Sequence, residues 1–183
     1  MAADPFWGNL FRRSAPHQQD LQALLRQVPV FADLTQRELR KMASILHRRR
    51  YAAEESIVRE GEQGVGMYVI LSGRVEVLQV GHDGAMQLLA TFGPGDFFGE
   101  QALLDETPRT ASVVALEACQ ALGFFRTDLL DLIEGQPRLG LKIVMRISQM
   151  ISVRLRHTNR LLKEAQYTEK GDEVPLDPDK REV

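Results

Sequence analysis

The residues best suited to chemistry lie in one short stretch, residues 98–113, which reads FGEQALLDETPRTASV. Glu100 supplies a carboxylate and Arg109 a guanidinium group. The guanidinium can offer a planar fork of hydrogen-bond donors to an anion such as a phosphate. An ionised carboxylate only accepts hydrogen bonds and repels a phosphate, so its partners must be donors such as hydroxyl groups. The stretch therefore predicts a ligand with one anionic group and hydroxyl groups close to it.

The local structure expected around this stretch also favours an anion. Gly99 and Glu100 fall where a strand-like run, Asp96–Phe98, gives way to a short helical pattern, Gln101–Leu104. The first amides of a helix have no partners within the helix and can bind an anion. The chain has no Walker lysine motif and no paired carboxylates to hold magnesium. A single arginine therefore suits a singly charged phosphodiester better than a triphosphate.

This stretch resembles the phosphate-binding cassette of the cyclic nucleotide-binding domain family, which includes catabolite-activator-like regulators and regulatory subunits of cyclic-AMP-dependent kinases. The family pattern is FGE, then a small and two apolar residues, then PR, a small residue and Ala. This chain supplies it with Phe98, Gly99, Glu100, Ala102, Leu103, Leu104, Pro108, Arg109, Thr110 and Ala111. The resemblance covers roughly Leu24–Leu162 and includes loop-like runs at residues 60–73 and 93–96.

The resemblance implies roles for individual residues of the cassette. Glu100 is expected to take the ribose 2′-hydroxyl, and Arg109 the exocyclic phosphate oxygens. The implied site consists of Gly99, Glu100, Gln101, Ala102, Arg109, Thr110 and Ala111. Cyclic AMP is the expected ligand and cyclic GMP the alternative, because the Thr110 hydroxyl can serve either a guanine amino group or a phosphate oxygen.

Two further groups of residues are candidates to contact the base. Val77 and Leu89 lie on adjacent predicted strands as inward candidates, although alternation fits ordinary core residues equally well. In the family the C-terminal helix covers the purine. One count along this helix points to Arg154 and another to Thr158. These two residues share a helix face, because they are four positions apart, and the sequence leaves the choice between them open.

The elements expected to position this site are mostly strands. From residue 47 onward, short alternating runs are broken by Gly, Asp and Glu, which is typical of antiparallel strands. Strands are predicted at residues 48–52, 56–59, 67–71, 74–80, 86–92, immediately before 99, 110–116 and 119–125. Such a set closes as a jelly roll. The predicted fold is α+β: an eight-stranded antiparallel β roll with N-terminal helices, a short cassette helix and a long C-terminal helix.

Helices are predicted on both sides of the roll. Gln18–Arg26 reads as a short helix, and Thr35 with Glu38 forms a capping box for a helix over Gln36–Ile45. After the roll, Thr127 is predicted to cap a short helix that ends near Ile133.

A long final helix is predicted from Pro137 to about Gln166. Its apolar stripe consists of Val144, Ile147, Ile151 and Leu155 and continues with Thr158 and Leu162. The spacing predicts that one face is buried along the whole length of the helix. The surface that buries it is either this domain or the same helix of a second copy.

The chain is expected to divide into three segments. Residues 1–17 are predicted to be a flexible N-terminal segment, 18–165 a binding domain that includes the C-terminal lid or dimer helix, and 166–183 a disordered tail. The N-terminal segment contains Phe6, Trp7, Leu10 and Phe11 beside two arginines, which suits contact with a partner or with the chain's own body. The tail is too short for a helix-turn-helix domain, so sequence-specific DNA binding is not expected.

Composition restricts the class of protein further. The formal charge of −2 gives no general attraction to nucleic acid or anionic lipid. The single cysteine, Cys119, fits a reducing compartment, and no apolar run is long enough to span a membrane. The four histidines are scattered and predict no metal site. No nucleophile, base and acid follow a known catalytic pattern. The expectation is a cytoplasmic protein without enzymatic activity.

The predicted function is a regulatory module that senses a cyclic nucleotide. Movement of the C-terminal helix would relay ligand binding to a partner protein or to a second copy of the chain. The alternative is a protein-interaction scaffold whose nucleotide pocket is retained but unoccupied. Titration with cyclic AMP and cyclic GMP separates these two hypotheses.

Overall fold

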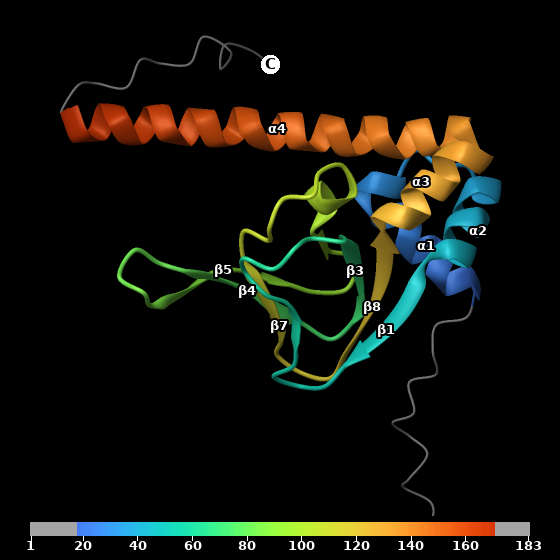
Figure 1. The fold of residues 1–183 in the computed structure, drawn as a ribbon, viewed down its shortest axis with the longest axis horizontal. Helices are drawn as coiled ribbons and strands as arrows, with labels where there is room; N and C mark the ends of the chain where they lie inside the picture. Colours follow the sequence, from blue (N-terminus) through green and yellow to red (C-terminus); the bar gives the residue numbers. More distant parts are fainter. Residues whose placement is uncertain (1–17, 171–183) are drawn as a thin grey trace, which may run out of the picture.

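The structure of the chain, a computed structural model, describes residues 18–170. The α-helices lie at the two ends of this range and the strands lie between them (Figure 1). The helical elements are α1 (Gln18–Gln27), η1 (Pro29–Phe31), α2 (Gln36–Ile45), η2 (Glu100–Leu103), α3 (Arg126–Gly135) and α4 (Pro137–Lys170), where η denotes a 3-10 helix. The strands are β1 (His47–Tyr51), β2 (Ser56–Val58), β3 (Gly66–Ser72), β4 (Val75–Val80), β5 (Met86–Phe92), β6 (Phe97–Phe98), β7 (Ser112–Ala115) and β8 (Cys119–Phe125).

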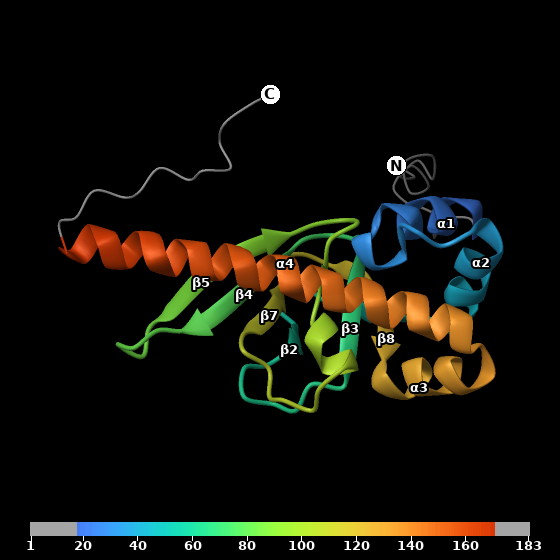
Figure 2. The same cartoon turned by 90° about the horizontal axis from the view of Figure 1, so that it is seen from above.

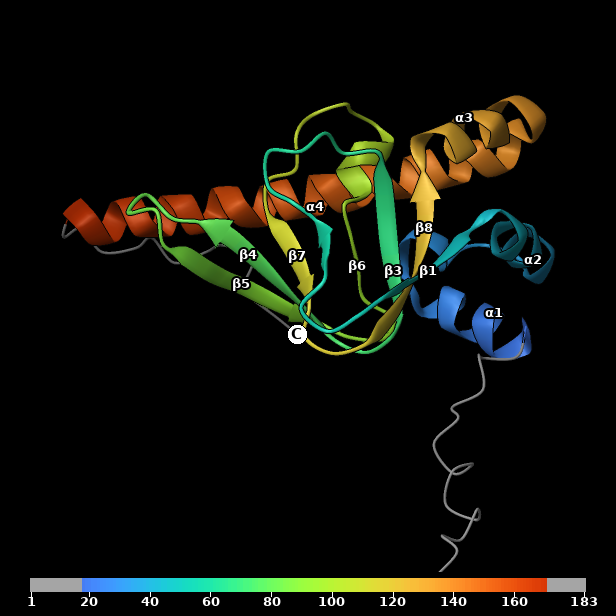
Figure 3. The same ribbon diagram turned by 60° about the horizontal axis from the view of Figure 1, so that its bottom comes forward.

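The strands form two antiparallel sheets, which confirms the predicted eight-stranded roll. One sheet has the order β1-β8-β3-β6 and the other β2-β7-β4-β5 (Figure 3). The strand predicted at residues 110–116 is shorter than expected and begins at Ser112. The preceding residues are held differently, because the Arg109 amide donates to the Glu62 carbonyl and the Thr110 carbonyl accepts from the Gln79 side chain.

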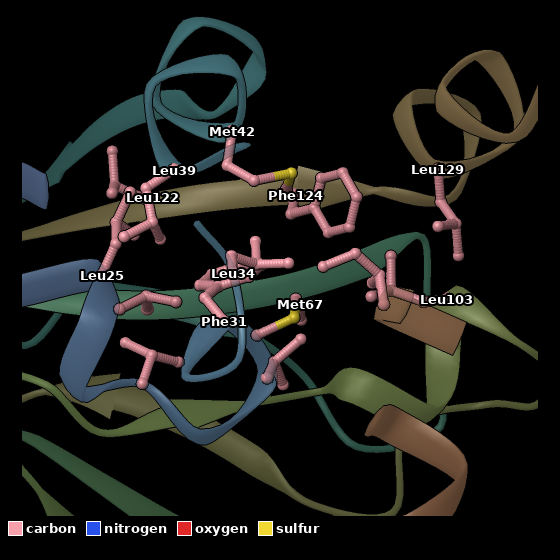
Figure 4. Close-up of a cluster of buried hydrophobic side chains, with 14 of the residues drawn as sticks. Leu25, Phe31, Leu34, Leu39, Met42, Met67, Leu103, Leu122, Phe124 and Leu129 are labelled. Carbon is pink, nitrogen blue, oxygen red and sulfur yellow. The ribbon is translucent and has the colours of Figure 1, made fainter. Parts of the chain in front are cut away.

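Strand β3 separates two apolar clusters and is buried on both faces. Met67 and Val69 face the larger cluster, which is shared with the N-terminal helices, α3 and α4. Tyr68 and Ile70 face the smaller cluster inside the roll. Figure 4 shows part of the larger cluster, where side chains of α1 and α2 meet those of β3, β8 and α3. The helices are therefore fixed to the outside of one sheet by the same strand that lines the interior of the roll.

The ends of α2 and α3 test the two capping predictions. The α2 prediction is confirmed, because Thr35 Oγ1 accepts from the Glu38 amide at 3.3 Å and the Thr35 amide donates to Glu38 Oε2 at 2.8 Å. The prediction that Thr127 caps α3 is wrong. The helix already includes Arg126, and the Asp128 carboxylate accepts from the Phe125 amide at 2.9 Å. Asp128 reaches this free amide from within the first turn, so no cap from Thr127 is needed.

Helix α4 differs from its prediction in two respects. It continues to Lys170, so the first residues of the predicted tail are helical, and helix formers without Gly or Pro precede Gly171. Residues 171–183 lie outside the described range. Burial is also limited to the first half: Ile143 and Ile147 are fully buried, whereas Leu155 is 58% and Leu162 57% exposed. The single chain therefore does not bury the stripe along its whole length, and burial of the remainder against a second copy stays a prediction.

The cause of this difference is visible in the arrangement of the elements. The first half of α4 packs on η1 and α3. The second half extends past η2 in the same general direction as the β4–β5 hairpin, from which Figure 1 shows it separated. The predicted stripe included Ile147 but missed the buried Leu139 and Ile143, and the described part of the single chain supplies no surface to cover its second half.

Candidate functional site

A cavity of about 190 Å³ opens between the roll, the 98–111 stretch and α4. Its lining comes from β2, β4, the end of β5, β6, η2, the loop before β7, and one residue of α4. The lining residues are Val58, Val77, Phe92, Phe97, Phe98, Gly99, Glu100, Gln101, Ala102, Thr107, Pro108, Arg109, Thr110, Ala111 and Arg154. The structure thus brings together all seven predicted cassette residues, Val77 and Arg154.

Gly99 makes the turn from β6 into η2 and has a left-handed backbone, with φ of 79°. A side chain here would be strained, and its Cβ would collide with the guanidinium of Arg109. The η2 helix has only four residues. Its Ala102 amide donates to the Gly99 carbonyl at 3.2 Å, so the turn itself occupies one of the helix amides that could bind an anion.

Two backbone carbonyls hold the side chain of Arg109. Its Nη2 donates to the Gly66 carbonyl at 2.6 Å and its Nη1 to the Gly99 carbonyl at 3.3 Å. Burial lowers the pKa of Arg109, while Tyr68 and Glu100 act in the opposite direction. An arginine remains protonated in proteins, so the cavity contains a half-buried cation whose direction is fixed by the backbone.

Gly66 is a functional residue that sequence reasoning missed. A Cβ on Gly66 would collide with the backbone of Phe124 and Phe125 on the neighbouring strand β8. Only glycine therefore allows β3 to lie so close to β8 while its carbonyl points to Arg109. The signal in the sequence was the closely spaced pair Gly64 and Gly66 before an apolar strand.

Glu100 is the buried polar residue of the site, with 3% of its surface exposed. Arg154 from α4 donates from Nη1 to Glu100 Oε1 at 2.6 Å. A buried carboxylate needs such a partner, because burial without one is strongly unfavourable. The side chain of Arg154 is itself 60% exposed, so this ion pair connects the interior of the cavity to the surface of α4.

The two α4 candidates differ in their contacts. Arg154 lines the cavity and pairs with Glu100. The Thr158 hydroxyl instead donates to the Arg154 carbonyl within the helix at 3.1 Å, and the residue is exposed outside the cavity lining. Of the two candidates, Arg154 is thus the one that reaches the cavity and bonds to the cassette.

The prediction that Leu89 points inward is wrong. Val77 pairs with Ala90 and Leu78 with Leu88, so Leu89 is an additional residue in a β-bulge. The bulge interrupts the alternation on which the prediction depended, and Leu89 is 52% exposed. The apolar wall comes from Val77 and the cassette residue Phe98, together with side chains that the sequence analysis did not select, namely Val58, Phe92 and Phe97.

Gln79 is a second residue that the sequence analysis missed. Its side-chain Nε2 donates to the Thr110 carbonyl at 2.9 Å. The backbone immediately after Arg109 is therefore tied to β4, the strand that also contributes Val77 to the cavity. A lone glutamine on a strand gives no sequence signal for such a contact.

The arrangement suits a ligand with three different parts. The guanidinium of Arg109 can bind an anionic group, and the Glu100 carboxylate can accept from hydroxyls. The apolar wall at Val77 and the phenylalanines can pack against a flat ring. Among the described residues, no group of three or more His, Cys, Asp or Glu side chains is placed to hold a metal ion. None of the described helices has the length and apolar character needed to span a bilayer.

Comparisons with known proteins agree with this geometry. A sequence profile described as the cyclic nucleotide-binding domain matches residues 48–136. The "Cyclic AMP receptor protein" of Thermus thermophilus is 33% identical over 146 residues, which are 80% of this chain and 66% of that protein. The "cGMP-dependent protein kinase 2" of Mus musculus is 34% identical over 112 residues, 60% of this chain and 15% of the kinase. The chain thus spans less than two thirds of either relative.

A solved structure gives the same result for the fold. The crystal structure of the Thermus thermophilus catabolite activator protein superposes with a TM-score of 0.69 and 33% identity, covering 76% of this chain and 63% of that one. The matching profile describes a ligand-binding domain, in agreement with the prediction of a non-enzymatic regulatory module.

Proposed function

The chain belongs to the cyclic nucleotide-binding domain family, and on this premise we propose that its cavity binds cyclic AMP and passes the binding event to α4. The name of the Thermus thermophilus relative supports cyclic AMP as the first choice. The name of the mouse kinase supports cyclic GMP as the alternative. The exposed Thr110 hydroxyl is the group in the cavity lining most able to distinguish the two bases.

Each part of the ligand has a proposed partner in the cavity. Arg109 binds the cyclic phosphate through the donors that Gly66 and Gly99 leave available. Glu100 accepts from the ribose 2′-hydroxyl, and the amides of the η2 turn and of Thr110 and Ala111 complete the cradle. The base packs against the wall that includes Val77 and Phe92.

The observation that carries the proposed relay is the ion pair between Glu100 and Arg154. The carboxylate proposed to receive the ribose is already bonded to α4 at 2.6 Å. A hydroxyl that bonds to Glu100 must share this carboxylate with Arg154 or displace it. Occupation of the ribose site therefore alters the ion pair that holds the second half of α4 against the cassette. A ligand can shift α4 only by the difference between its affinities for the two positions.

The recipient of the signal is proposed to be a second copy of the chain or another protein that covers the second half of α4. Leu155 and Leu162 are exposed on this half and continue the stripe that Val144 and Ile151 begin. The spacing suits a helix pair across a dimer axis. A change in the position of α4 would then change its fit to that partner.

Hydrogen exchange with and without cyclic AMP tests the proposal. The expected result is protection of residues 99–111 together with altered exchange in residues 152–163, and no change in α3 as the internal control. Protection confined to residues 99–111 would contradict the relay and keep the binding site. Unchanged exchange in residues 99–111 at saturating ligand would contradict the site itself.

A further inference from the structure

Charge is distributed very unevenly along this nearly neutral chain. Residues 137–163, most of α4, contain no Asp or Glu and carry the cations Arg138, Lys142, Arg146, Arg154, Arg156, Arg160 and Lys163. The formal charge of the whole chain is only −2. The positive charge of α4 must therefore be balanced by acidic residues elsewhere in the chain.

Most of these cations follow one line along α4, here called the cationic stripe. It consists of Arg138, Lys142, Arg146, Arg156, Arg160 and Lys163, which with Gln149 and Val153 repeat every three or four positions. Arg154 faces the roll, where it bonds to Glu100. Arg156 lies two positions further, about 200° around the helix, so this part of the stripe points away from the roll.

The first half of the stripe is neutralised by a neighbouring segment of the same chain. Lys142 Nζ lies 2.7 Å from Glu38 Oε1, and Arg146 Nη1 lies 3.6 Å from Asp33 Oδ2. Both acidic residues belong to the N-terminal part of the chain, which lies alongside only the first half of α4 (Figure 2). Where an acidic segment of the chain lies beside the stripe, the cations thus pair with it.

The second half of the stripe is exposed and borders an open hollow. Arg156 and Lys163 form no ion pair with any acidic side chain that the structure describes, and Arg160 bonds to His157 at 3.0 Å. The hollow of about 900 Å³ lies on this side of α4, and Pro29, Met145, Val153 and Arg156 are among its lining residues. The surface therefore offers cations next to a shallow apolar depression.

We propose that the acidic C-terminal segment, residues 171–183, docks in an extended form along the second half of the cationic stripe. Its sequence, GDEVPLDPDKREV, contains five acidic and two basic residues, interleaved with Val174 and Leu176. It thus offers the two properties that the surface lacks: negative charge for Arg156 and Lys163, and apolar side chains for the hollow.

The length of the segment fits this arrangement. Helix α4 ends at Lys170, and a rise of about 1.5 Å per residue puts Lys163 about 10 Å and Arg156 about 21 Å back from that end. An extended chain that reverses direction there advances about 3.3 Å per residue. Glu173 then comes level with Lys163 and Asp177 with Arg156, while Leu176 approaches the hollow beside Val153.

Because the C-terminal segment is covalently attached to α4, weak ion pairs are sufficient to dock it on the cationic stripe. Exposed ion pairs are individually weak, but a short linker gives an effective concentration of about millimolar. The docked segment would occupy the stripe before any external polyanion could. An acidic protein or a nucleic acid would bind this face only by displacing the segment.

A spin label within the C-terminal segment tests the docking directly. Residue 178 lies about 26 Å back along α4 in the proposed arrangement, level with Val153. Pro178→Cys can be labelled selectively because Cys119 is buried, and wild-type protein given the same reagent is the control. The expected result is relaxation enhancement at the backbone amides of residues 153–163. Glu173→Gln/Asp177→Asn in the labelled chain, or 1 M NaCl with its Debye length of about 3 Å, should remove it. Enhancement that is unchanged by both treatments would overturn the proposal.

Heparin chromatography of the full chain supplies an independent test. Glu173→Gln/Asp177→Asn should elute at a higher salt concentration than wild type, because an undocked segment exposes the stripe. Asp131→Asn/Glu134→Gln on α3 removes the same charge from an exposed surface and should elute close to wild type. Equal shifts for the two variants would show a net-charge effect and overturn docking. Both tests are independent of cyclic nucleotide binding.

Discussion

The two halves of α4 share one helix and one apolar stripe, but the chain uses them differently. The first half buries Leu139, Ile143 and Ile147 in the larger core cluster. The second half leaves Leu155 and Leu162 exposed, and among the described side chains it is joined to the roll by the ion pair from Arg154 to Glu100. The first half is therefore structural, whereas the second is held mainly by a contact that a ligand at Glu100 would alter.

Under the proposed relay, this difference would make α4 both an anchor and a sensor. Because α4 is continuous, a ligand that altered the contact of Arg154 would act on a helix whose first half is fixed in the core. The proposed ligand meets the helix only just beyond the packed part. The following predictions, ordered from the largest expected effect to the smallest, test this division.

The largest expected difference is in how much a side chain of each half of α4 contributes to the free energy of unfolding. Ile147→Ala should lower the free energy of unfolding by about 2 to 5 kcal/mol, because it leaves a cavity in a fully buried cluster. The matched change Leu155→Ala should alter it by less than about 0.5 kcal/mol in dilute protein. Chemical denaturation measures both. Equal losses would contradict the division, and a loss for Leu155→Ala that grows with protein concentration would identify a second copy on the exposed half.

Removal of the cation in the cavity should have the next largest effect. Arg109→Ala should lose a charge-assisted contact of about 1.5 to 3 kcal/mol, which corresponds to a roughly 10-fold to 150-fold weaker affinity for cyclic AMP. Arg109→Lys should restore only part of it, because an ammonium retains the charge but not the planar fork. Wild-type affinity in Arg109→Ala, measured by calorimetry, would put the phosphate elsewhere.

Truncation can separate the anchor from the sensor. A chain that ends at Ser152 retains Ile143 and Ile147, so the roll should remain folded. Its affinity for cyclic AMP should fall about 10-fold, or about 1.4 kcal/mol, because Arg154 and the covering part of α4 are removed. Circular dichroism checks the fold and calorimetry the affinity. A folded truncated protein with unchanged affinity would exclude the second half of α4 as a lid.

If Glu100 bonds to the ribose, the effects on affinity of changing Glu100 and of removing the 2′-hydroxyl should be coupled. Glu100→Gln should weaken binding, and a 2′-deoxy analogue should then lose less in the mutant than in wild type. The coupling should be about 0.5 to 1.5 kcal/mol, the value of one hydrogen bond. Additive losses across the four combinations of protein and ligand would remove Glu100 from the ribose.

The smallest expected effect concerns the ion pair that ties the anchored half of α4 to α2. The hydrogen bond from Lys142 is the main cause that lowers the pKa of Glu38 below its usual 4.5. A lowered carboxylate pKa adds stability above the unfolded-state pKa, and this stability is lost as the pH falls through the lower folded-state value. Unfolding curves should show a shallower acid dependence below pH 4.5 in Glu38→Gln than in wild type. Identical dependence would mean that this exposed pair contributes nothing.

The sequence predicted the cassette well because its residues are close together along the chain. Glu100 and Arg109 belong to one local motif, and the seven residues of the implied binding site all line the same cavity. The strands and the α2 cap were also predictable, since alternation and the Thr35–Glu38 pair are local signals.

The errors arose where a distant or irregular feature decides the outcome. One of the two carbonyls that hold Arg109 belongs to Gly66, on a strand far from it in the sequence. Leu89 turned outward because of a bulge that no pattern of residue types records. Periodicity identified the apolar face of α4 but could not say where the covering surface ends, so the exposure of Leu155 was unpredictable.

Calorimetric titration of the full chain with cyclic AMP, cyclic GMP and 5′-AMP tests the central claim most directly. A cyclic phosphodiester is singly charged and suits one guanidinium, whereas 5′-AMP bears a phosphomonoester with more charge and a different shape. The account predicts saturable binding of cyclic AMP at one site per chain, cyclic GMP binding within about two orders of magnitude or about 2.7 kcal/mol, and much weaker binding of 5′-AMP. Absence of heat and of thermal stabilisation with both cyclic nucleotides would contradict it.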